Sequence, residues 1–286
     1  MSRIAYVNGR YRLHADAVVH VEDRGYQFAD GVYEVIAVQR GRMVDEGPHL
    51  SRLDRSLSEL RIPWPMSRRA LRVVLVEVIG RNRIIDSGLV YLQITRGVAP
   101  RSHAIPSATA SSLVVTARPL PPFDRDAARK GVAVITIPDI RWRRCDIKTV
   151  SLLPNVLGKQ QAIDAGAFDA WMIDSDGAVT EGTASNAWIV SAAGELVTRQ
   201  ASSAILNGIT RCAVFGIAAD QGCKLVERPF TVAEAKSAAE AFQTSTTSVV
   251  KPVVRIDDTM IGVGKIGPLT ERLLDLYAGH MLAAGE

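Results

Sequence analysis

The 286-residue sequence predicts an α/β (α+β) protein made of two domains. Three observations support this prediction. Stretches typical of strands recur along the chain, stretches with helical periodicity fall between them, and a cluster of prolines interrupts the pattern near the middle. The hydrophobic share of 47% with 22% charged residues is typical of a globular protein with a sizeable core.

The first half begins with strands. Asn8 and Gly9 separate two short strand-like runs, which is a strong hairpin signal. Leucines 50, 53, 57 and 60 follow at helical spacing, and Ser67 is a suitable N-cap for a second helix. Strands are predicted at residues 4–7, 10–13, 31–40, 43–44, 89–95 and 112–117, the last two as a pair, and helices from about residue 48 and over 66–81.

Three prolines, Pro119, Pro121 and Pro122, then break the pattern between two strand-rich regions. We therefore predict a small N-terminal α/β domain at residues 1–118, a linker at 119–126 and a larger C-terminal domain at 127–286. In the second half, strands are predicted at residues 132–137, 169–174, 187–190 and 241–244, and helices at 155–165, from 208 to about 220, at 231–239 and from about 268 to the end.

Composition excludes several classes of function. The net charge is +4, but the 34 basic residues are spread along the chain among 30 acidic ones, and the tightest cluster, residues 141–144, is too small for a nucleic-acid arm. Apolar stretches are too short for a signal peptide or a membrane span. Three widely spaced cysteines without a CxxC pair argue against disulfides and a zinc site. We expect a soluble, cytoplasmic protein with no metal, no nucleic-acid partner and no membrane partner.

Only seven of the 34 basic residues are lysines, so each candidate amine nucleophile can be considered singly. Lys148 lies in DIKT at residues 146–149, between apolar Ile147 and Val150. A lysine in a loop is ordinarily a solvated surface charge. A partly desolvated lysine, however, loses its proton more readily and can attack a carbonyl carbon.

Two further segments contain groups that suit an aromatic, phosphorylated cofactor. TEGTASN at residues 180–186 surrounds Glu181 with hydroxyl groups; it reads either as a polar turn or as a buried carboxylate that pairs with a protonated ring nitrogen. LNGITR at residues 206–211 opens a helix, where free N–H groups favour phosphate, although many helices begin this way.

Two loops complete the set of polar segments. QTSTTS at residues 243–248 follows a predicted strand, and its hydroxyls suit a second anion contact or form a plain loop. TRGVAPRSH at residues 95–103 places Arg101 and His103 on one side of an extended stretch. These two residues are either a carboxylate clamp or a surface charge pair.

Together and in this order, the segments resemble those of the fold-type IV pyridoxal-phosphate aminotransferases, and most nearly the D-amino-acid aminotransferases. The resemblance extends from YVNG at residues 6–9 to GKIGP at residues 264–268. It implies pyridoxal 5'-phosphate as the cofactor, held between the two domains, and a homodimer in which the RxH loop reaches over from the neighbouring subunit. Ala184 departs from the serine usual in that group, and Lys251 from a threonine.

The resemblance also implies roles for individual residues. Lys148 would carry the cofactor as a Schiff base and move the proton, and Glu181 would pair with the pyridine nitrogen. The cofactor phosphate would be bound by Arg52, Ile209, Thr210, Thr246 and Thr247, and the substrate carboxylate by Tyr33, Arg101 and His103.

The implied reaction is a ping-pong transamination between a D-amino acid resembling D-alanine and a 2-keto acid. Three other activities within the same superfamily stay open as alternatives: an R-selective amine transaminase, a branched-chain aminotransferase and an aminodeoxychorismate lyase.

Overall fold

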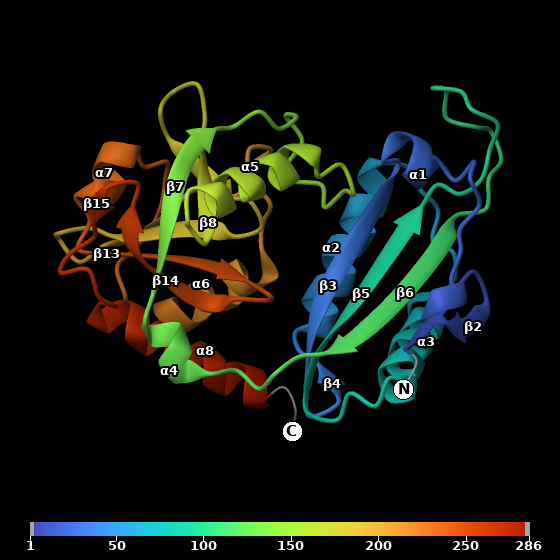
Figure 1. Cartoon of the computed structure of the whole chain (residues 1–286), viewed down its shortest axis with the longest axis horizontal. Coiled ribbons are helices and arrows are strands. Elements are labelled where there is room, and N and C mark those ends of the chain that lie inside the picture. The colour runs from blue at the N-terminus through green and yellow to red at the C-terminus, as the bar shows by residue number, and fades with distance from the viewer. Residues whose placement is uncertain (1–2, 284–286) are drawn as a thin grey trace. The chain divides into compact units, whose positions relative to one another are not determined.

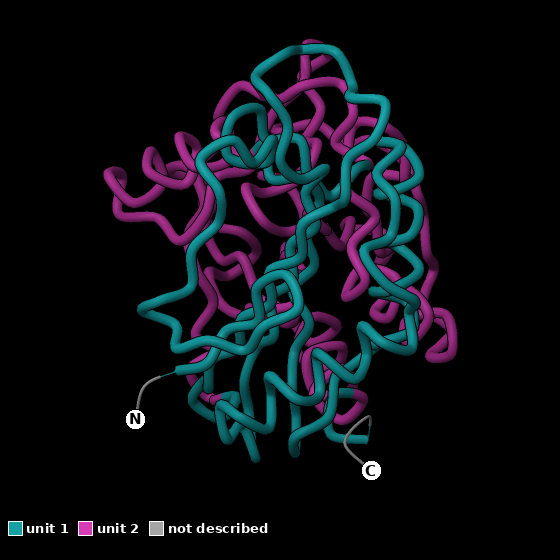
Figure 2. Tube along the Cα trace, turned by 90° about the vertical axis from the view of Figure 1, so that its right-hand side faces the viewer, with its two compact units in different colours: residues 1–123, 147–151, 281–286 teal, residues 124–146, 152–280 magenta. Residues whose placement is uncertain are grey.

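The computed structural model describes residues 3–283 and confirms the mixed α/β class (Figure 1). The chain divides into two compact units (Figure 2). Unit 1 contains residues 1–123, 147–151 and 281–286, and unit 2 contains residues 124–146 and 152–280.

Unit 1 is built on a six-stranded antiparallel sheet in the order β2-β1-β6-β5-β3-β4. Its strands are β1 (Ile4–Val7), β2 (Arg10–Leu13), β3 (Gly31–Gln39), β4 (Arg42–Met43), β5 (Ser87–Thr95) and β6 (Ser112–Pro119). The predicted hairpin of β1 with β2 and the predicted pairing of β5 with β6 are both confirmed.

Two helices cover one face of this sheet. Helix α2 (Glu46–Glu59) packs on β3, and α3 (Arg68–Arg81) packs on β1 and β6 (Figure 1). Ser67 caps α3 as predicted, because its side chain accepts a hydrogen bond from the N–H of Ala70. The core between helices and sheet is aliphatic and includes Leu53, Leu75 and Leu92. A short helix, α1 (Arg24–Phe28), precedes β3.

The segment of residues 147–151 belongs to unit 1 because it pairs with the start of β3. Thr149 forms an isolated antiparallel bridge with Val32. The N–H of Tyr33 donates to the carbonyl of Lys148 at 3.0 Å, and the N–H of Val150 donates to the carbonyl of Gly31 at 3.1 Å. This short ladder fixes the position of Lys148 beside β3.

Unit 2 contains a mixed sheet in the order β12-β11-β10-β13-β14-β7-β8-β9, with β15 paired to β14. The strands are β7 (Val132–Pro138), β8 (Asp169–Ile173), β9 (Val179–Gly182), β10 (Asn186–Val190), β11 (Leu196–Thr198), β12 (Leu225–Glu227), β13 (Glu240–Ser245), β14 (Val249–Ile256) and β15 (Thr259–Met260). The helices are α4 (Arg125–Arg129), α5 (Leu153–Asp164), α6 (Ile209–Asp220), α7 (Val232–Lys236) and α8 (Pro268–Ala283), the last of which belongs to unit 2 as far as residue 280. The sheet curls so that β9 contacts β10.

The structure departs from the sequence-based elements in several places. The short elements α1, α4, β11, β12 and β15 were not predicted, and three further departures have clear reasons. Residues 179–182, which could be interpreted as a polar turn, form the fully buried strand β9. Strand β14 was not predicted, because its Lys251-Pro252 pair and the preceding hydroxyl run resemble a loop. Helix α7 has five residues rather than the nine predicted at 231–239. Over residues 3–283, no helix is both long and apolar enough to cross a membrane.

Candidate active site

Lys148 lies against the ring of Tyr33. Its Nζ is 4.3 Å from the ring centroid, within the range of a cation–π contact. The backbone N–H of Lys148 donates to Ser56 Oγ of α2 at 3.3 Å, while its carbonyl accepts from β3. The backbone of Lys148 is thus held on both sides by elements of unit 1, and its partly buried side chain is directed onto Tyr33.

Arg52 of α2 is held by a buried carboxylate on β3. Glu34 is fully buried and accepts from Nε and from one terminal nitrogen of Arg52, both at 2.8 Å. It also binds His49 Nδ1 at 2.7 Å. Burial opposes ionisation of Glu34, yet the Arg52 guanidinium and the His49 hydrogen bond lower its pKa to about 2.

Burial lowers the pKa of His49, and the nearby cations of Arg52 and Lys148 act in the same direction. The imidazole is therefore neutral near pH 7, and the tautomer with hydrogen on Nδ1 satisfies Glu34. The buried pair of Glu34 and His49 thus orients the guanidinium of the partly buried Arg52.

Arg101 and His103 lie in the irregular loop between β5 and β6, and both contact Phe28 of α1. The Arg101 guanidinium carbon is 4.9 Å from the Phe28 ring centroid, and the His103 ring is 5.4 Å from it. Within residues 3–283, the ring and cation contacts of this pair are with Phe28 rather than with Tyr33 or Lys148. Both side chains are exposed.

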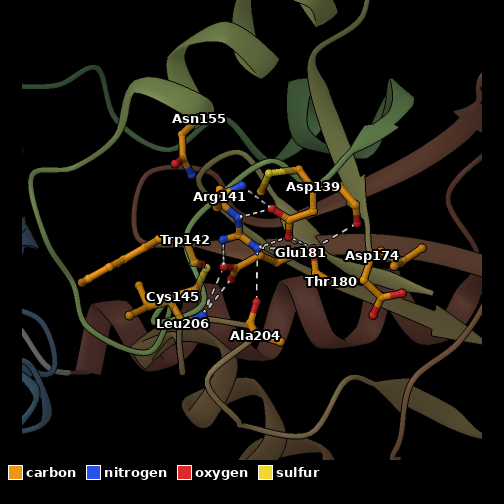
Figure 3. Close-up of polar contacts among 12 residues, drawn as sticks. Asp139, Arg141, Trp142, Cys145, Asn155, Asp174, Thr180, Glu181, Ala204 and Leu206 are labelled. Carbon is orange, nitrogen blue, oxygen red and sulfur yellow. Dashed lines mark hydrogen bonds and ion pairs between the residues drawn. The ribbon is translucent and has the colours of Figure 1, made fainter. Parts of the chain in front are cut away.

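In unit 2, Glu181 on β9 lies inside a cluster of donors (Figure 3). It pairs with Arg141 and accepts from the side-chain amide of Asn186 at 3.0 Å. The backbone N–H of Leu206 is shared between its two oxygens at 3.2 and 3.1 Å. Arg141 is held in turn by Asp139, whose Oδ2 is 2.7 Å from the guanidinium.

Burial raises the pKa of Glu181 above its ordinary value, and the Arg141 guanidinium opposes that rise. Burial acts in the same way on Asp139, but there the hydrogen bond with Arg141 prevails and the pKa is lowered. Although burial alone would lower the pKa of Arg141, its pairing with two carboxylates raises it, so the guanidinium stays charged. Glu181 is therefore a buried acid whose ionisation is disfavoured by burial and favoured by the permanent cation beside it.

The chemistry of Glu181 fits a protonated ring nitrogen. Among the described residues, three groups donate to Glu181, namely Arg141, Asn186 and the N–H of Leu206, and the last is shared between its two oxygens. All three are hydrogen-bond donors, so the site is built to receive N–H groups. A pyridinium N–H would bring a positive charge as well as a donor, and it would favour the ionised form of Glu181 that burial disfavours.

The polar segments of unit 2 converge on Asn186. Its amide donates to Glu181 and to the carbonyl of Leu206, the latter at 2.8 Å. Gly208 is so close that a Cβ there would lie 2.2 Å from Asn186 Oδ1. On the neighbouring strand β13, Asn186 pairs with Thr244. TEGTASN, LNGITR and QTSTTS therefore meet where strand β10 begins and the neighbouring strand β13 ends.

The four residues of unit 2 that are predicted to contact the phosphate lie directly after these segments' meeting point, at the start of α6 and after the end of β13. Ile209 and Thr210 form the first turn of α6, where no side chain of the described residues caps the helix. Their N–H groups therefore have no acceptor within the helix, which suits an anion. The Thr210 hydroxyl lies 3.4 Å from the hydroxyl of Tyr277. Thr246 and Thr247 form the turn after β13, where the Thr247 hydroxyl is 3.3 Å from Ser245 Oγ.

The hydroxyl groups that flank Glu181 in the sequence donate hydrogen bonds to other carboxylates. Thr183 and Ser185 donate to Asp169, the latter at 2.9 Å, and Thr180 donates to Asp139 at 2.8 Å. The structure thus replaces the expected hydroxyl donors of Glu181 with a guanidinium, an amide and a backbone N–H. The hydroxyls instead brace the loop of residues 183–185 and the Asp139–Arg141 pair.

The predicted residues therefore fall into two sets. Unit 1 contains Tyr33, Arg52, Arg101, His103 and Lys148, and unit 2 contains Glu181, Ile209, Thr210, Thr246 and Thr247. Sequence reasoning missed the groups that hold them. Glu34 had a usable signal, because an acid among Val32, Ile36 and Val38 on the inward face of a strand requires a partner. Arg141 had no such signal in the sequence, because the basic cluster of residues 141–144 resembles a group of exposed surface charges.

Comparison with known proteins places the chain in a family. Residues 31–256 match the family described as amino-transferase class IV. Because that match spans most of the chain, this protein belongs to the class IV aminotransferases.

Particular relatives can then be named. The chain is 41% identical to the D-alanine aminotransferase of Bacillus licheniformis over 96% of both chains. It is 39% identical to that of Listeria innocua over 97% of this chain and 96% of the relative. Its fold matches a branched-chain amino acid aminotransferase from T.th. that was crystallised with pyridoxamine 5'-phosphate. The TM-score is 0.91 at 25% identity, covering 99% of this chain and 95% of the other.

Proposed function

We propose that this aminotransferase uses pyridoxal 5'-phosphate to exchange the amino group between a D-amino acid of the D-alanine kind and a 2-keto acid. The observation that carries the proposal is the placement of Lys148, whose backbone is bound on both sides and whose amine lies on Tyr33. The identity of 41% to a D-alanine aminotransferase, against 25% to a branched-chain enzyme, supports the D-amino-acid assignment.

Lys148 would hold the cofactor through its side-chain amine, and the same amine would remove and return the proton at the reacting carbons. When bound, pyridoxal phosphate supplies the electron sink that makes the α-proton acidic. Glu181 would accept a hydrogen bond from the pyridinium N–H of that group and so keep its nitrogen protonated. Arg141 opposes the effect of burial on Glu181 and so favours the ionised form that this task requires.

The cofactor phosphate would be bound by Arg52 of unit 1 and by the N–H groups of Ile209 and Thr210 of unit 2, with Thr246 and Thr247 as further donors. The first turn of α6 is free of a side-chain cap among the described residues, and Arg52 is pre-oriented by Glu34. Both features favour phosphate binding, because little ordering is left to occur when the anion arrives.

Tyr33, Arg101 and His103 bind the substrate carboxylate. The two cationic or dipolar donors of the RxH loop are exposed in the single chain. We also propose a cytoplasmic homodimer in which this loop serves the neighbouring subunit. Exposed apolar side chains of unit 1, Val18, Val21 and Tyr26, support association, and the three free cysteines fit a reducing compartment.

The deciding experiment is the visible spectrum of the purified protein, followed by separate additions of D-alanine, L-alanine and an R-configured arylalkylamine. We expect a yellow band from lysine-bound cofactor that bleaches with D-alanine but not with L-alanine. Bleaching by the amine alone would instead identify an amine transaminase, and release of pyruvate without any keto acid would identify a lyase.

A matched pair of variants assigns the lysine. Lys148→Ala should abolish the band and lower turnover at least about a thousandfold, because one amine performs both attachment and proton transfer. Lys265→Ala, at an exposed lysine of unit 2, should keep both. Normal turnover in Lys148→Ala would refute the assignment.

A further inference from the structure

The loop that carries Arg101 and His103 has no regular structure to hold it. Residues 96–111 connect β5 to β6 without a helix or a strand. Placing two long side chains of such a loop on a small carboxylate costs conformational entropy unless the loop is already ordered. The structure contains an arrangement that provides this order.

The base of the loop is tied to the segment before β3. Gly97 has φ +93 and accepts from the N–H of Arg24 at 2.9 Å. Val98 forms an isolated bridge with Asp23, and the N–H of Ala99 donates to Glu22 at 3.4 Å. A Cβ on Gly97 would lie 2.0 Å from the carbonyl oxygen of Ala110, so the loop closes tightly on itself at this glycine.

The tip of the loop is held by Arg24. The buried guanidinium of Arg24 donates to the carbonyl of Ser102, the residue between Arg101 and His103, at 2.6 Å. Its Nε donates to Asp30 at 2.8 Å. Asp30 is fixed in turn by buried Arg96, at 2.7 Å from its Oδ2, and Arg96 also donates to the carbonyl of Leu60. A continuous chain of ion pairs and hydrogen bonds thus connects the loop tip to the interior of unit 1.

Phe28 completes the arrangement. Three side chains contact its ring: the Arg24 guanidinium carbon is 4.8 Å from the centroid, that of Arg101 is 4.9 Å, and the His103 ring is 5.4 Å. Arg24 fixes the backbone between Arg101 and His103, and Phe28 fixes the two side chains themselves. Both functional side chains of the loop therefore contact one partly buried ring of a different element.

We propose that Phe28 is a positioning residue for substrate recognition, which holds Arg101 and His103 in the orientation that receives the carboxylate of the amino acid. This inference rests on the proposed function for its substrate, whereas the contact that it describes is independent of any activity. Removing the ring should make Arg101 and His103 more mobile and so weaken binding of the carboxylate. It should leave Lys148 and its neighbours unchanged, because Phe28 acts through Arg101 and His103.

The kinetic test compares three variants. Phe28→Leu keeps an apolar side chain but removes the ring, and it should raise KM for D-alanine roughly three- to tenfold while kcat stays within about twofold, as expected for two weak ring contacts. Phe28→Tyr keeps the ring and should restore the KM. Phe123→Leu makes the same change at a partly buried phenylalanine after β6 and should behave as wild type.

A nuclear magnetic resonance measurement tests the contact without turnover. The chain has five histidines, and the imidazole resonance of His103 can be assigned by its loss in His103→Gln. We expect Phe28→Leu to shift that resonance alone, because the ring current of Phe28 is removed. An unshifted His103 resonance, or a kcat that falls with unchanged KM, would overturn the positioning role.

The two proposals fail in distinguishable ways. Wild-type protein that is unreactive with D-alanine, but in which Phe28→Leu shifts His103, would overturn the proposed substrate and with it the role of Phe28 in recognising it. Wild-type protein that consumes D-alanine, with equal KM in Phe28→Leu, would overturn the role of Phe28 alone.

Discussion

At the scale of single residues, the environment of Glu181 shows how a neighbouring cation offsets the cost of ionising a buried carboxylic acid. Glu181 and Asp139 both lie against Arg141, and each carboxylate raises the cost of ionising the other. The guanidinium of Arg141 pairs with both carboxylates and lowers the free-energy cost of ionising each of them. A buried ion pair is costly to break, because the remaining charge stays desolvated.

Arg141→Met should therefore lower the free energy of unfolding by roughly 3–5 kcal/mol, since it leaves the buried carboxylate of Glu181 and the partly buried one of Asp139 without their cation. Arg143→Met removes an exposed arginine of the same cluster and should change stability by less than about 0.5 kcal/mol. Urea unfolding followed by far-ultraviolet circular dichroism measures both. Equal effects would mean that Arg141 contributes only surface charge.

The lowered pKa of Glu34 predicts how the stability of the fold depends on pH. Its pKa is about 2 in the folded protein against an ordinary value of 4.5, so the folded state binds the proton less tightly than the unfolded state. Such a carboxylate adds stability above pH 4.5, and that stability is lost as the pH falls toward 2. The shift corresponds to about 3 kcal/mol when complete.

In Glu34→Gln this contribution is absent at every pH. The variant should be less stable than wild type at pH 7, and the two curves of unfolding free energy should converge between pH 4.5 and 2. Glu77→Gln, at an exposed glutamate of α3, should run parallel to wild type. Urea midpoints at a series of acidic pH values give the comparison, and parallel curves for Glu34→Gln would contradict the prediction.

The same residues show what sequence reasoning reaches. Lys148 and Glu181 were predicted as site residues because each lies in a short polar segment, and the order of these segments along the chain resembles that of a known family. Arg141 and Asn186 were not, because their importance depends on which strands become neighbours. Strand β9 contacts β10 because the sheet curls, and no local sequence pattern in residues 139–186 predicts this contact.

At the scale of elements, the start of α6 is locked to β10. Gly208 is the N-cap of α6, and a Cβ on it would overlap Asn186 Oδ1 at 2.2 Å. Asn186 would have to move, and its hydrogen bonds to Glu181 and Leu206 would be strained or lost. Glycine at this position is therefore required by close packing.

Gly208→Ala should lower stability by about 1–3 kcal/mol, the usual cost of an unsatisfied buried polar group, and should weaken pyridoxal phosphate binding. Gly216→Ala, in the middle of the same helix, should raise stability by about 0.5–1 kcal/mol, because a Cβ there meets nothing within 4 Å. The opposite signs, measured by thermal unfolding and by cofactor titration, make the test sharp. A stabilised Gly208→Ala would refute the locking of α6 to β10.

Elements with a clear period were predicted well, and those dominated by context were not. β3, β5, α3 and α6 begin and end within a few residues of their predicted bounds, since alternation, helical spacing, Ser67 and Gly208 mark them. β9 is buried on both faces although its sequence is VTEG, because hydrogen bonds to Arg141 and Asn186 satisfy its acid. Tertiary partners override local propensity there.

At the scale of the whole molecule, the order of motifs along the chain carries more information than any one of them. Residues 147–151 illustrate this. They follow β7 of unit 2 in sequence but pair with β3 of unit 1, so Lys148 joins Tyr33 across more than a hundred residues of chain. No periodicity in the sequence predicts that return, and only the resemblance of the ordered set placed Lys148 and Tyr33 in one function.

Association of two chains is the remaining prediction for the whole molecule. Val18, Val21 and Tyr26 are 72%, 72% and 77% exposed in a short stretch of unit 1, and large apolar side chains grouped in this way favour a protein interface. Light scattering coupled to size-exclusion chromatography should therefore give twice the 30.9 kDa chain mass. Tyr26→Glu should shift the protein toward the single-chain mass, because a buried unpaired carboxylate is costly. Val263→Glu changes a valine of unit 2 that is 86% exposed and should leave the mass unchanged. A wild-type mass of 30.9 kDa, or an identical response of the two variants, would contradict a dimer formed through this stretch.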